Sequence, residues 1–473
     1  MRRFASALLV VAALLATSCA ADDDNQAVST DTTVATGDTD SPTGDTVKFG
    51  TLDSPCGEAP DGKVATVKAE DAGRGTDKLY IGVANDRASI RAGLLQELWE
   101  TTTAFVSWCN DQGGINGLPL EAIDLDGKLF EIEGAMATAC TDTFALVGGG
   151  WAQDNLMFTG KDGSDFHKCG LIAFPGFAAS PEFAGATDIV NVGPNPPNRQ
   201  PTASLDALAQ AFPGETSNLA ILFPDLDSLR TRAAQTIATA EQVDGFDQFH
   251  QIAYSPVSQD WGVLAQQVLA SGATSVFAIG EPATLSLLNQ ALRDQNFEGP
   301  IATEINVYDQ RTIDAAGPEA AEGITVAMRS YFGPFEEADQ YPVTRQLIDI
   351  LDEYSPNWTR ASLVANSWSA NLMFATTAKA CAQEGEISRV CMLQKGQAVD
   401  DWDTGGLGLP VNIAEDTASL CSILMQVRDG KFQRLYPEKG GADAENMGMH
   451  CGELVDIEGD FGVGNRESSI LDN

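Results

Sequence analysis

An alternation of short apolar runs with amphipathic stretches, beginning at residue 78, constrains the fold of this chain more than any other feature. The run 79–84 predicts a buried strand, and 93–112 predicts a helix because its apolar side chains recur at helical spacing. Strand–helix alternation of this kind is typical of parallel βαβ units, in which helices cover both faces of a sheet. The pattern continues with strands at 120–125, 144–148 and 171–174 and a helix at 133–140.

The alternation restarts near residue 198, which predicts a second α/β lobe. Its strands are expected at 218–223, 249–254, 275–280 and 300–303, and its helices at 198–212, 229–242, 261–270 and 285–294. A strand near 323–326 and two long helices at 341–354 and 362–381 follow. Asp429-Gly430, between two apolar runs, predicts a hairpin with a tight turn.

The first residues have the layout of an export signal. Arg2 and Arg3 precede an apolar stretch at 4–15, which is shorter than the ~20 residues that a membrane-spanning helix needs. Small residues at 16–18 directly before Cys19 resemble the lipobox of bacterial lipoproteins. That resemblance implies a signal peptide at 1–18, a diacylglyceryl group on Cys19 and an extracytoplasmic protein that contacts the membrane only through this anchor. The alternative is an ordinary secretory signal followed by an unrelated cysteine.

Two segments outside the alternating region are polar. Residues 22–47 carry seven aspartates and no basic residue, so they cannot bury enough apolar surface to fold. We therefore predict an acidic flexible tether at 19–77, with Cys56 as a possible attachment to the folded part. Residues 438–473 are predicted to form a polar C-terminal tail.

Charge and motif content exclude several functions. With 28 basic and 67 acidic residues the net charge is −39, which argues against nucleic-acid binding. Three histidines and scattered cysteines offer no clustered metal ligands, so neither a metal nor a cofactor is expected. The chain has no G-x-S-x-G or H-E-x-x-H motif, and the glycines at 148–150 lack both G-x-G-x-x-G spacing and a P-loop lysine. We predict that the protein is not an enzyme and has no catalytic residues.

Four passages appear in an order that resembles a known family. They are the helix end Asn110-Asp111-Gln112-Gly113-Gly114-Ile115-Asn116-Gly117 and the segments 144–150, 169–182 and 253–280. Together they resemble type I periplasmic binding proteins of the leucine/isoleucine/valine-binding group, over residues 78 to about 437. Trp108-Cys109-Asn110 is similar to the helix end of actinobacterial lipoprotein members.

The resemblance implies an α/β protein with two doubly wound parallel-sheet lobes, joined by three crossings, and a ligand cleft between them. The first lobe would comprise 78–197 and 323–379, and the second 198–322 and 380–437. It also implies a monomeric solute-binding protein that delivers a small polar ligand, such as an amino acid or amide, to the permease of an ABC importer. The alternatives are a ligand-sensing receptor domain of the same fold and, less favoured, a secreted α/β enzyme.

Loops after the strands supply the candidate ligand-binding residues, because ligands of open α/β sheets bind beyond the carboxyl ends of the strands. The family's carboxylate-binding hydroxyls would fall near Ala152 and near Ala178 or Ala179, where none exists, which argues against a branched-chain amino acid. Glu304 matches the family's amine-binding glutamate, and Arg87 could pair with an anionic group. The full set is Asn85, Arg87, Trp151, Ala152, Gln153, Phe177, Ala178, Asp227, Glu281, Glu304 and Tyr308.

Eight cysteines remain after Cys19, and an even number in an exported protein predicts four disulfides. Cys381 and Cys391 lie ten residues apart across a helix connection and are the first expected pair. Cys421 with Cys451 would attach the tail to the second lobe. Cys140 with Cys169 and Cys56 with Cys109 are what is left over, and other pairings of these four stay open. A catalytic thiol would need a histidine partner, and the spacing of the histidines supplies none.

Overall fold

The computed structural model describes residues 47–157, 164–329, 331–461 and 468–471. The predicted lipidation site at Cys19 and most of the predicted tether lie outside these residues. The chain divides into residues 1–45 and a compact unit, 46–473, and the description below concerns that unit alone.

The first lobe is built on a parallel four-stranded sheet of order β4-β3-β5-β6. Every residue of the central strand β3 is buried, as expected for a strand covered by helices on both faces. Its strands are β3 (Leu79–Asn85), β4 (Leu120–Asp126), β5 (Ala145–Val147) and β6 (Ala173–Phe174). Its helices in this part of the chain are α1 (Gln96–Asp111), α2 (Ile132–Asp142), α3 (Asp154–Met157), α4 (Asp165–Lys168) and α5 (Pro181–Ala184).

The second lobe is built on an eight-stranded sheet of order β14-β13-β12-β11-β10-β8-β9, with β15 paired to β13. The strands from β8 to β12 are parallel, whereas β13 and β14 form the predicted antiparallel hairpin. The strands are β8 (Asn218–Pro224), β9 (Gln248–Tyr254), β10 (Ser275–Ala278), β11 (Ile301–Glu304), β12 (Ile324–Arg329), β13 (Cys421–Arg428), β14 (Lys431–Tyr436) and β15 (His450–Cys451). The helices are α6 (Ala203–Ala211), α7 (Asp227–Ala240), α8 (Trp261–Ser271), α9 (Pro282–Asp294), α10 (Gln310–Asp314) and α11 (Pro318–Ala321).

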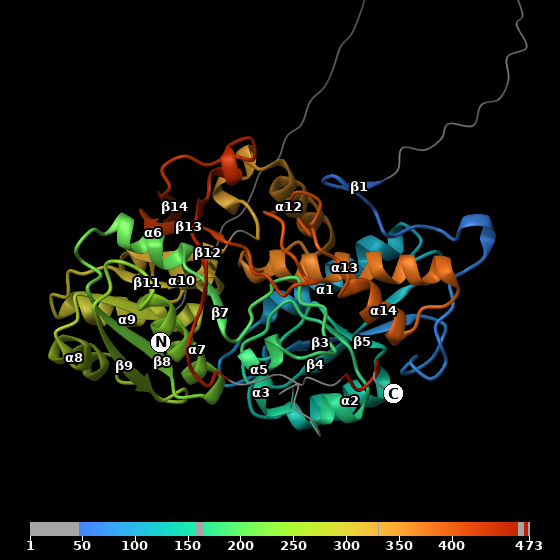
Figure 1. The fold of residues 1–473 in the computed structure, drawn as a ribbon, viewed down its shortest axis with the longest axis horizontal. Helices are drawn as coiled ribbons and strands as arrows, with labels where there is room; N and C mark the ends of the chain where they lie inside the picture. Colours follow the sequence, from blue (N-terminus) through green and yellow to red (C-terminus); the bar gives the residue numbers. More distant parts are fainter. Residues whose placement is uncertain (1–46, 158–163, 330, 462–467, 472–473) are drawn as a thin grey trace, which may run out of the picture. The chain divides into compact units, whose positions relative to one another are not determined.

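After β12 the chain returns to the first lobe through α12 (Pro342–Tyr354), α13 (Leu363–Glu384) and α14 (Arg389–Gly396). Figure 1 shows α13 and α14, in orange, beside the blue and teal elements of the first lobe. The indole of Trp368 on α13 lies 5.2 Å from the ring of Phe105 and 5.3 Å from that of Trp108, both on α1. These aromatic contacts join the two longest helices of the lobe into one core.

Two predicted lobe boundaries are wrong. Residues 324–329 were assigned to the first lobe, but β12 pairs with β11 and β13 inside the second sheet. Residues 380–396 were assigned to the second lobe, but α14 packs against α13 of the first. The crossings therefore come later in the chain than predicted. Periodicity identifies a strand or helix but carries no information about which of two similar lobes will bury its apolar face.

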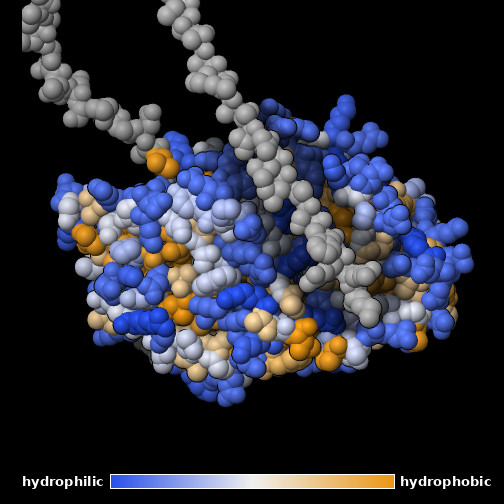
Figure 2. Space-filling view, turned by 180° about the vertical axis from the view of Figure 1, so that it is seen from behind, coloured by the Kyte–Doolittle hydropathy of each residue, from blue (hydrophilic) through white to orange (hydrophobic). Residues whose placement is uncertain are grey.

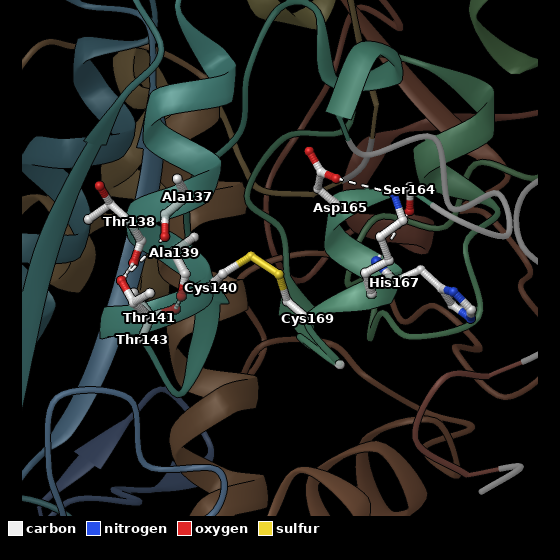
Figure 3. The surroundings of a disulfide bond; sticks show 12 residues. Ala137, Thr138, Ala139, Cys140, Thr141, Thr143, Ser164, Asp165, His167 and Cys169 are labelled. Carbon is white, nitrogen blue, oxygen red and sulfur yellow. Dashed lines mark hydrogen bonds and ion pairs between the residues drawn. A yellow bond between two sulfur atoms is a disulfide. The ribbon is translucent and has the colours of Figure 1, made fainter.

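All four predicted disulfides are confirmed: Cys56–Cys109, Cys140–Cys169, Cys381–Cys391 and Cys421–Cys451. Figure 3 shows the bond that joins Cys140 of α2 to Cys169, directly after α4. Cys421 and Cys451 lie opposite each other on β13 and β15. Within the predicted tail, β16 (Leu454–Asp456) also pairs with β7 (Arg199–Pro201), so the described part of 438–473 is integrated into the fold.

The described part of the predicted tether is also folded. Residues 48–53 form a short hairpin of β1 (Lys48–Phe49) and β2 (Leu52–Asp53). The ring of Phe49 is fully buried 5.5 Å from that of Trp368, and Val67 bridges to Ile387. Together with the Cys56–Cys109 bond, these contacts attach residues 47–77 to the first lobe, so the flexible segment predicted at 19–77 does not extend to residue 77.

In the ranges that the structure describes, no helix combines the length and apolar character required to cross a bilayer. The face drawn in Figure 2 is largely hydrophilic, with its hydrophobic residues in small separate areas. This surface agrees with the excess of acidic side chains in the sequence.

Candidate ligand-binding site

A cavity with a volume of about 170 Å³ lies between the two lobes. The first lobe contributes the loop 175–179 after β6, residues 191–195 and two side chains of α13. The second contributes the carboxyl ends of β10, β11 and β12 together with α7. A cavity at the carboxyl ends of parallel strands is where an open α/β sheet binds its ligands.

A second cavity, of about 90 Å³, adjoins the first on the side of α1. The two cavities share the apolar side chains of Phe177, Leu229 and Leu363, and Ala179, Gly280 and Asn306 also line both. The second cavity is lined mainly by leucine and proline side chains from both lobes. The interlobe space therefore has a polar compartment and a more apolar one.

Five of the eleven predicted ligand-binding residues line these cavities. Phe177 lines both, Ala178 and Glu304 line the larger one, and Ala152 and Glu281 line the smaller one. Glu304 is the last residue of β11 and the other four lie in segments that follow strands, as the topology rule predicts.

Arg87 is not free to bind an anionic ligand. Its Nη2 lies 2.5 Å from Oδ2 of Asp124 at the end of the neighbouring strand, and its guanidinium stacks 4.8 Å from the ring centre of Trp99. Arg87 lines neither cavity. The prediction that Arg87 holds an anionic ligand group is wrong, because Asp124 on the neighbouring parallel strand β4 already pairs with its guanidinium.

Trp151, Gln153 and Asn85 face the interior of the first lobe and do not line the cavities. The indole Nε1 of Trp151 donates to the carbonyl of Leu125 at 2.9 Å, and Nε2 of Gln153 donates to that of Leu129 at 2.6 Å. Asn85 is fully buried and donates to the Val83 carbonyl and to Asp124. Some residues of a loop that follows a strand face the core and others face the cleft. The sequence alone does not distinguish the two groups.

Asp227 and Tyr308 also lie away from the cavities. Asp227 is exposed and pairs with Arg230 one turn along α7. The buried Tyr308 hydroxyl hydrogen-bonds to the Glu336 carboxylate and accepts from the Phe335 N–H at 2.8 Å. Burial raises the pKa of Tyr308 well above its usual range. Both residues are structural, which corrects their assignment as ligand contacts.

Glu304 lines the larger cavity at the end of β11, where the sequence places it, but an arginine that the sequence analysis did not identify pairs with it. Oε1 of Glu304 accepts from Nε of Arg232 on α7 at 2.6 Å, and both side chains are largely buried. Arg232 also donates through Nη1 to Oε1 of Gln200 at 3.1 Å. The charge of Glu304 is therefore already compensated by a residue of its own lobe.

The glycines of the cleft loops are required by close backbone packing. A Cβ on Gly149 would lie 2.3 Å from the Ala84 N, and one on Gly150 would lie 2.3 Å from the Phe177 carbonyl oxygen. A Cβ on Gly176 would approach the Gly148 carbonyl oxygen equally closely. The loops after β5 and β6 thus pack on each other and on β3.

Backbone N–H groups of these first-lobe loops donate hydrogen bonds to two buried carboxylates. Asp86 accepts from the Ala152 N–H at 2.8 Å and from the Leu129 N–H at 2.7 Å. Burial raises the pKa of Asp86 to about 6, although these hydrogen bonds oppose the shift. No sequence motif indicates this role, because Asp86 resembles any other acidic residue after a strand.

Asp154 plays the same part in the neighbouring loop. Its carboxylate accepts from the Ala179 N–H at 2.7 Å and from the Ser180 N–H at 2.9 Å. It is almost completely buried, and this burial raises its pKa to about 7. The amide groups near Ala152 and Ala179, where the family resemblance would place carboxylate recognition, thus already have partners.

Several hydrogen-bond donors of the larger cavity lack strong partners. Arg329, the last residue of β12, donates from Nη1 to Asn195 at 3.3 Å, and no carboxylate among the described residues pairs with it. Among the described residues, Nδ2 of Asn191 is buried without a hydrogen-bond partner, and so is the acceptor Oδ1 of Asn366. No motif marked these residues in the sequence.

Polar contacts cross between the lobes beside the smaller cavity. Arg91, after β3, lies 3.1 Å from Oε1 of Glu281 and donates to the Pro256 carbonyl at 2.7 Å. Arg311 on α10 lies 2.6 Å from Oε2 of Glu97 on α1. Burial raises the pKa of Glu97 and of Glu281, and in each case the facing arginine opposes the shift. These contacts hold the lobes together around the cavities.

Solved structures share this fold at low sequence identity. A fatty acid ABC transporter substrate-binding protein from Thermomonospora curvata matches with a TM-score of 0.63 and 16% identity, over 82% of this chain and 98% of that one. A branched-chain amino acid transporter substrate-binding protein from Streptococcus pneumoniae, in complex with isoleucine, matches with a TM-score of 0.60 and 15% identity, over 75% and 98%. A type 1 periplasmic binding protein from Bordetella pertussis matches with a TM-score of 0.61 and 14% identity, over 76% and 99%.

Comparison with curated proteins finds no match. The family model described as periplasmic binding protein matches residues 157–431, which is more than half of the chain and includes most of the cavity lining. The predicted two-lobed α/β fold is confirmed by the sheets described above and by the solved structures. The chain therefore belongs to the periplasmic binding protein family, with the type I fold.

Proposed function

We propose that this protein captures a small molecule between its lobes outside the cytoplasm and delivers it to the permease of an ABC importer. The observation that supports this proposal is the pair of adjoining cavities lined from both lobes and closed by the Arg91–Glu281 and Arg311–Glu97 ion pairs. Such a site exchanges its ligand when the lobes rotate apart about their crossings.

The titles of the solved relatives support a transport role. Two of them are described as substrate-binding proteins of transporters, one for a fatty acid and one for branched-chain amino acids. Membership of the family also implies an extracytoplasmic location. For this chain we propose a small ligand with at least one polar group, because charged and amide side chains line the larger cavity.

We further propose that a lipid on Cys19 retains the protein at the membrane and that residues 20–46 act as a spacer. The lipobox-like residues 16–19 and the acidic composition that follows support this part of the proposal. The protein would then act as a monomer whose only direct membrane contact is its lipid.

The transport proposal predicts closure on a ligand. The mature protein is screened by thermal shift against amino acids, amides, urea and small carboxylates, and each hit is confirmed by calorimetry. Small-angle scattering is then expected to give a smaller radius of gyration with a confirmed ligand than without it. Identical scattering profiles with and without saturating ligand would contradict the proposal. Import of the ligand by a co-encoded permease and ATPase should also require this protein, and import that does not require it would contradict the proposal as well.

A further inference from the structure

We infer that the ligand is a carboxylate with an apolar body, whose anionic group binds Arg329 and Arg232 of the second lobe. Its apolar body then lies against Phe177, Leu229 and Leu363 and extends toward the smaller cavity. This inference rests on the proposed function, because it concerns the ligand of the same cleft.

The first lobe has little to offer a carboxylate. The N–H groups of Ala152, Ala179 and Ser180 already donate to buried aspartates, and the N–H of Phe177 donates to the Gly149 carbonyl. A ligand carboxylate near Asp86 or Asp154 would displace or repel a carboxylate of the protein itself. Alanine at 152, 178 and 179 also excludes hydroxyl donors there.

The second lobe offers the missing positive charge. The charged side chains that line the larger cavity are Arg232, Arg329 and Glu304, so the lining has a net charge of +1. The chain as a whole has a net charge of −39. Glu304 compensates Arg232, so the uncompensated guanidinium is that of Arg329. A half-buried guanidinium without a carboxylate favours an anionic partner, because the ion pair strengthens in a water-poor site.

Glu304 also orients the second arginine. It engages Nε of Arg232, and Gln200 accepts from Nη1, so the described residues leave Nη2 without a partner. The planar guanidinium is thereby fixed while one N–H edge stays available for a carboxylate oxygen. In this arrangement Glu304 positions Arg232 and does not itself bind a ligand amine.

A neutral donor of the first lobe completes the set. Asn191 lines the same cavity and is 9 % exposed. Its Oδ1 accepts from the Gly193 N–H, and its buried Nδ2 has no partner among the residues that the structure describes. An unpaired buried donor costs free energy, so a ligand acceptor at this point is favoured. Donors from both lobes would then converge on one anionic group, which links binding to closure.

The neighbouring cavity suits the apolar body. Its charged side chains are already paired, Arg91 with Glu281 and Arg311 with Glu97, so they offer no strong binding to a second charged group. The rest of its lining is largely apolar, including Leu94, Leu129, Leu226 and Pro224. Burial of ligand carbon against such side chains stabilises the complex by removing apolar surface from water.

The test uses three probes of equal chain length and different head group: hexanoate, hexanamide and hexylamine. Calorimetry at pH 7 on the mature protein is expected to show that hexanoate binds most tightly. Arg329→Gln removes the charge and is expected to weaken hexanoate binding about 30-fold or more. It should change the affinity for hexanamide by less than about threefold, since no ion pair is lost. Arg329→Lys keeps the charge and should retain part of the affinity.

Arg87→Gln is the matched control, because it removes an arginine that is paired with Asp124 outside the cavities. Its affinity for hexanoate should equal that of the parent, and thermal unfolding checks that all variants are folded. Tighter binding of hexylamine or hexanamide than of hexanoate, or an equal loss in Arg87→Gln, would overturn the inference while leaving the proposed function standing. If neither these probes nor the wider ligand screen showed binding and closure, the proposed function would fail as well.

Discussion

Nη2 of Arg311 lies 2.6 Å from Oε2 of Glu97, and this ion pair joins α10, which follows β11 of the second sheet, to α1 of the first lobe. Arg311 also pairs with Asp309 two residues before it, and its Nη1 donates to the Gly93 carbonyl. Separation of the lobes would leave Arg311 with Asp309, whereas the Glu97 carboxylate would lose its only ion-pair partner among the described residues. The pair thus favours the closed arrangement chiefly through Glu97.

Glu97→Gln is therefore expected to shift the unliganded protein toward an open arrangement. The amide keeps the shape and can still accept from Arg311, but the ionic part of the contact, about 1–2 kcal/mol for a largely buried pair, is lost. Ligand affinity should fall about fivefold to 30-fold, because more of the closing free energy must come from the ligand. Small-angle scattering and calorimetry measure the two effects.

Glu121→Gln is the control for this variant. Glu121 pairs with Lys78 at 2.6 Å within the first lobe, so its loss should leave the scattering profile and the ligand affinity unchanged. Equal effects of Glu97→Gln and Glu121→Gln would show that the Glu97–Arg311 pair does not bias closure.

Asp154 should make stability depend on pH. Its folded pKa of about 7 lies above the ordinary value of about 4, so the folded protein binds the proton more tightly than the unfolded chain does. Its contribution is therefore largest below pH 4 and declines as the pH rises toward 7. In urea unfolding at pH 5 and pH 6.5, Asp154→Asn should have a less negative slope of unfolding free energy against pH than the parent, by at most about 1.4 kcal/mol per pH unit.

The variant should also be less stable at each pH, since an asparagine side chain can accept only one of the two N–H groups that Asp154 now satisfies. The unpaired amide costs about 1–3 kcal/mol. Asp165→Asn, in the first turn of α4 with a side chain 46% exposed, is the control and should leave the slope as it is. Parallel slopes for the parent and Asp154→Asn would contradict the raised pKa.

The disulfides predict that none of the eight cysteines after Cys19 is free in the oxidised protein. Thiol titration of the denatured, unreduced mature protein should detect fewer than one thiol per chain. Peptide mapping without reduction should recover Cys56 linked to Cys109 and Cys140 linked to Cys169. Detection of two or more thiols, or of exchanged pairs, would contradict the framework.

The lipid anchor predicts that Cys19→Ser abolishes membrane attachment. The variant should appear in the soluble extracytoplasmic fraction or remain as an uncleaved precursor, because no sulfur is available for the diacylglyceryl group. Ser18→Ala leaves the cysteine in place and should still partition into the detergent phase. Unchanged detergent partitioning of Cys19→Ser would rule out a lipid at this position.

The sequence predicted the fold well where burial and periodicity coincide. Strand β3 is an unbroken apolar run that both faces of the sheet bury, and α12 has one apolar face. The lobe to which β12 belongs could not be predicted, because its apolar residues would suit either sheet. Boundaries between similar lobes depend on long-range pairing, which local pattern does not encode.

The candidate site shows the same division. Position after a strand correctly brought Phe177, Glu281 and Glu304 to the cavities. It failed for Trp151 and Arg87, whose partners Leu125 and Asp124 both lie on strand β4. Arg232 and Arg329 were missed because one lies within a helix and the other ends a strand that had been assigned to the wrong lobe.

The attachment of residues 47–77 has a mechanical consequence. Phe49 packs on Trp368, and Cys56 is bonded to Cys109, so the N-terminal segment is fastened to the first lobe at two points. Tension applied to the N-terminal segment therefore acts on the first lobe and not on the segments that connect the two lobes. If the protein is tethered through Cys19, the tether holds the first lobe and the second lobe remains free to rotate. Opening of the cleft then does no work against the tether.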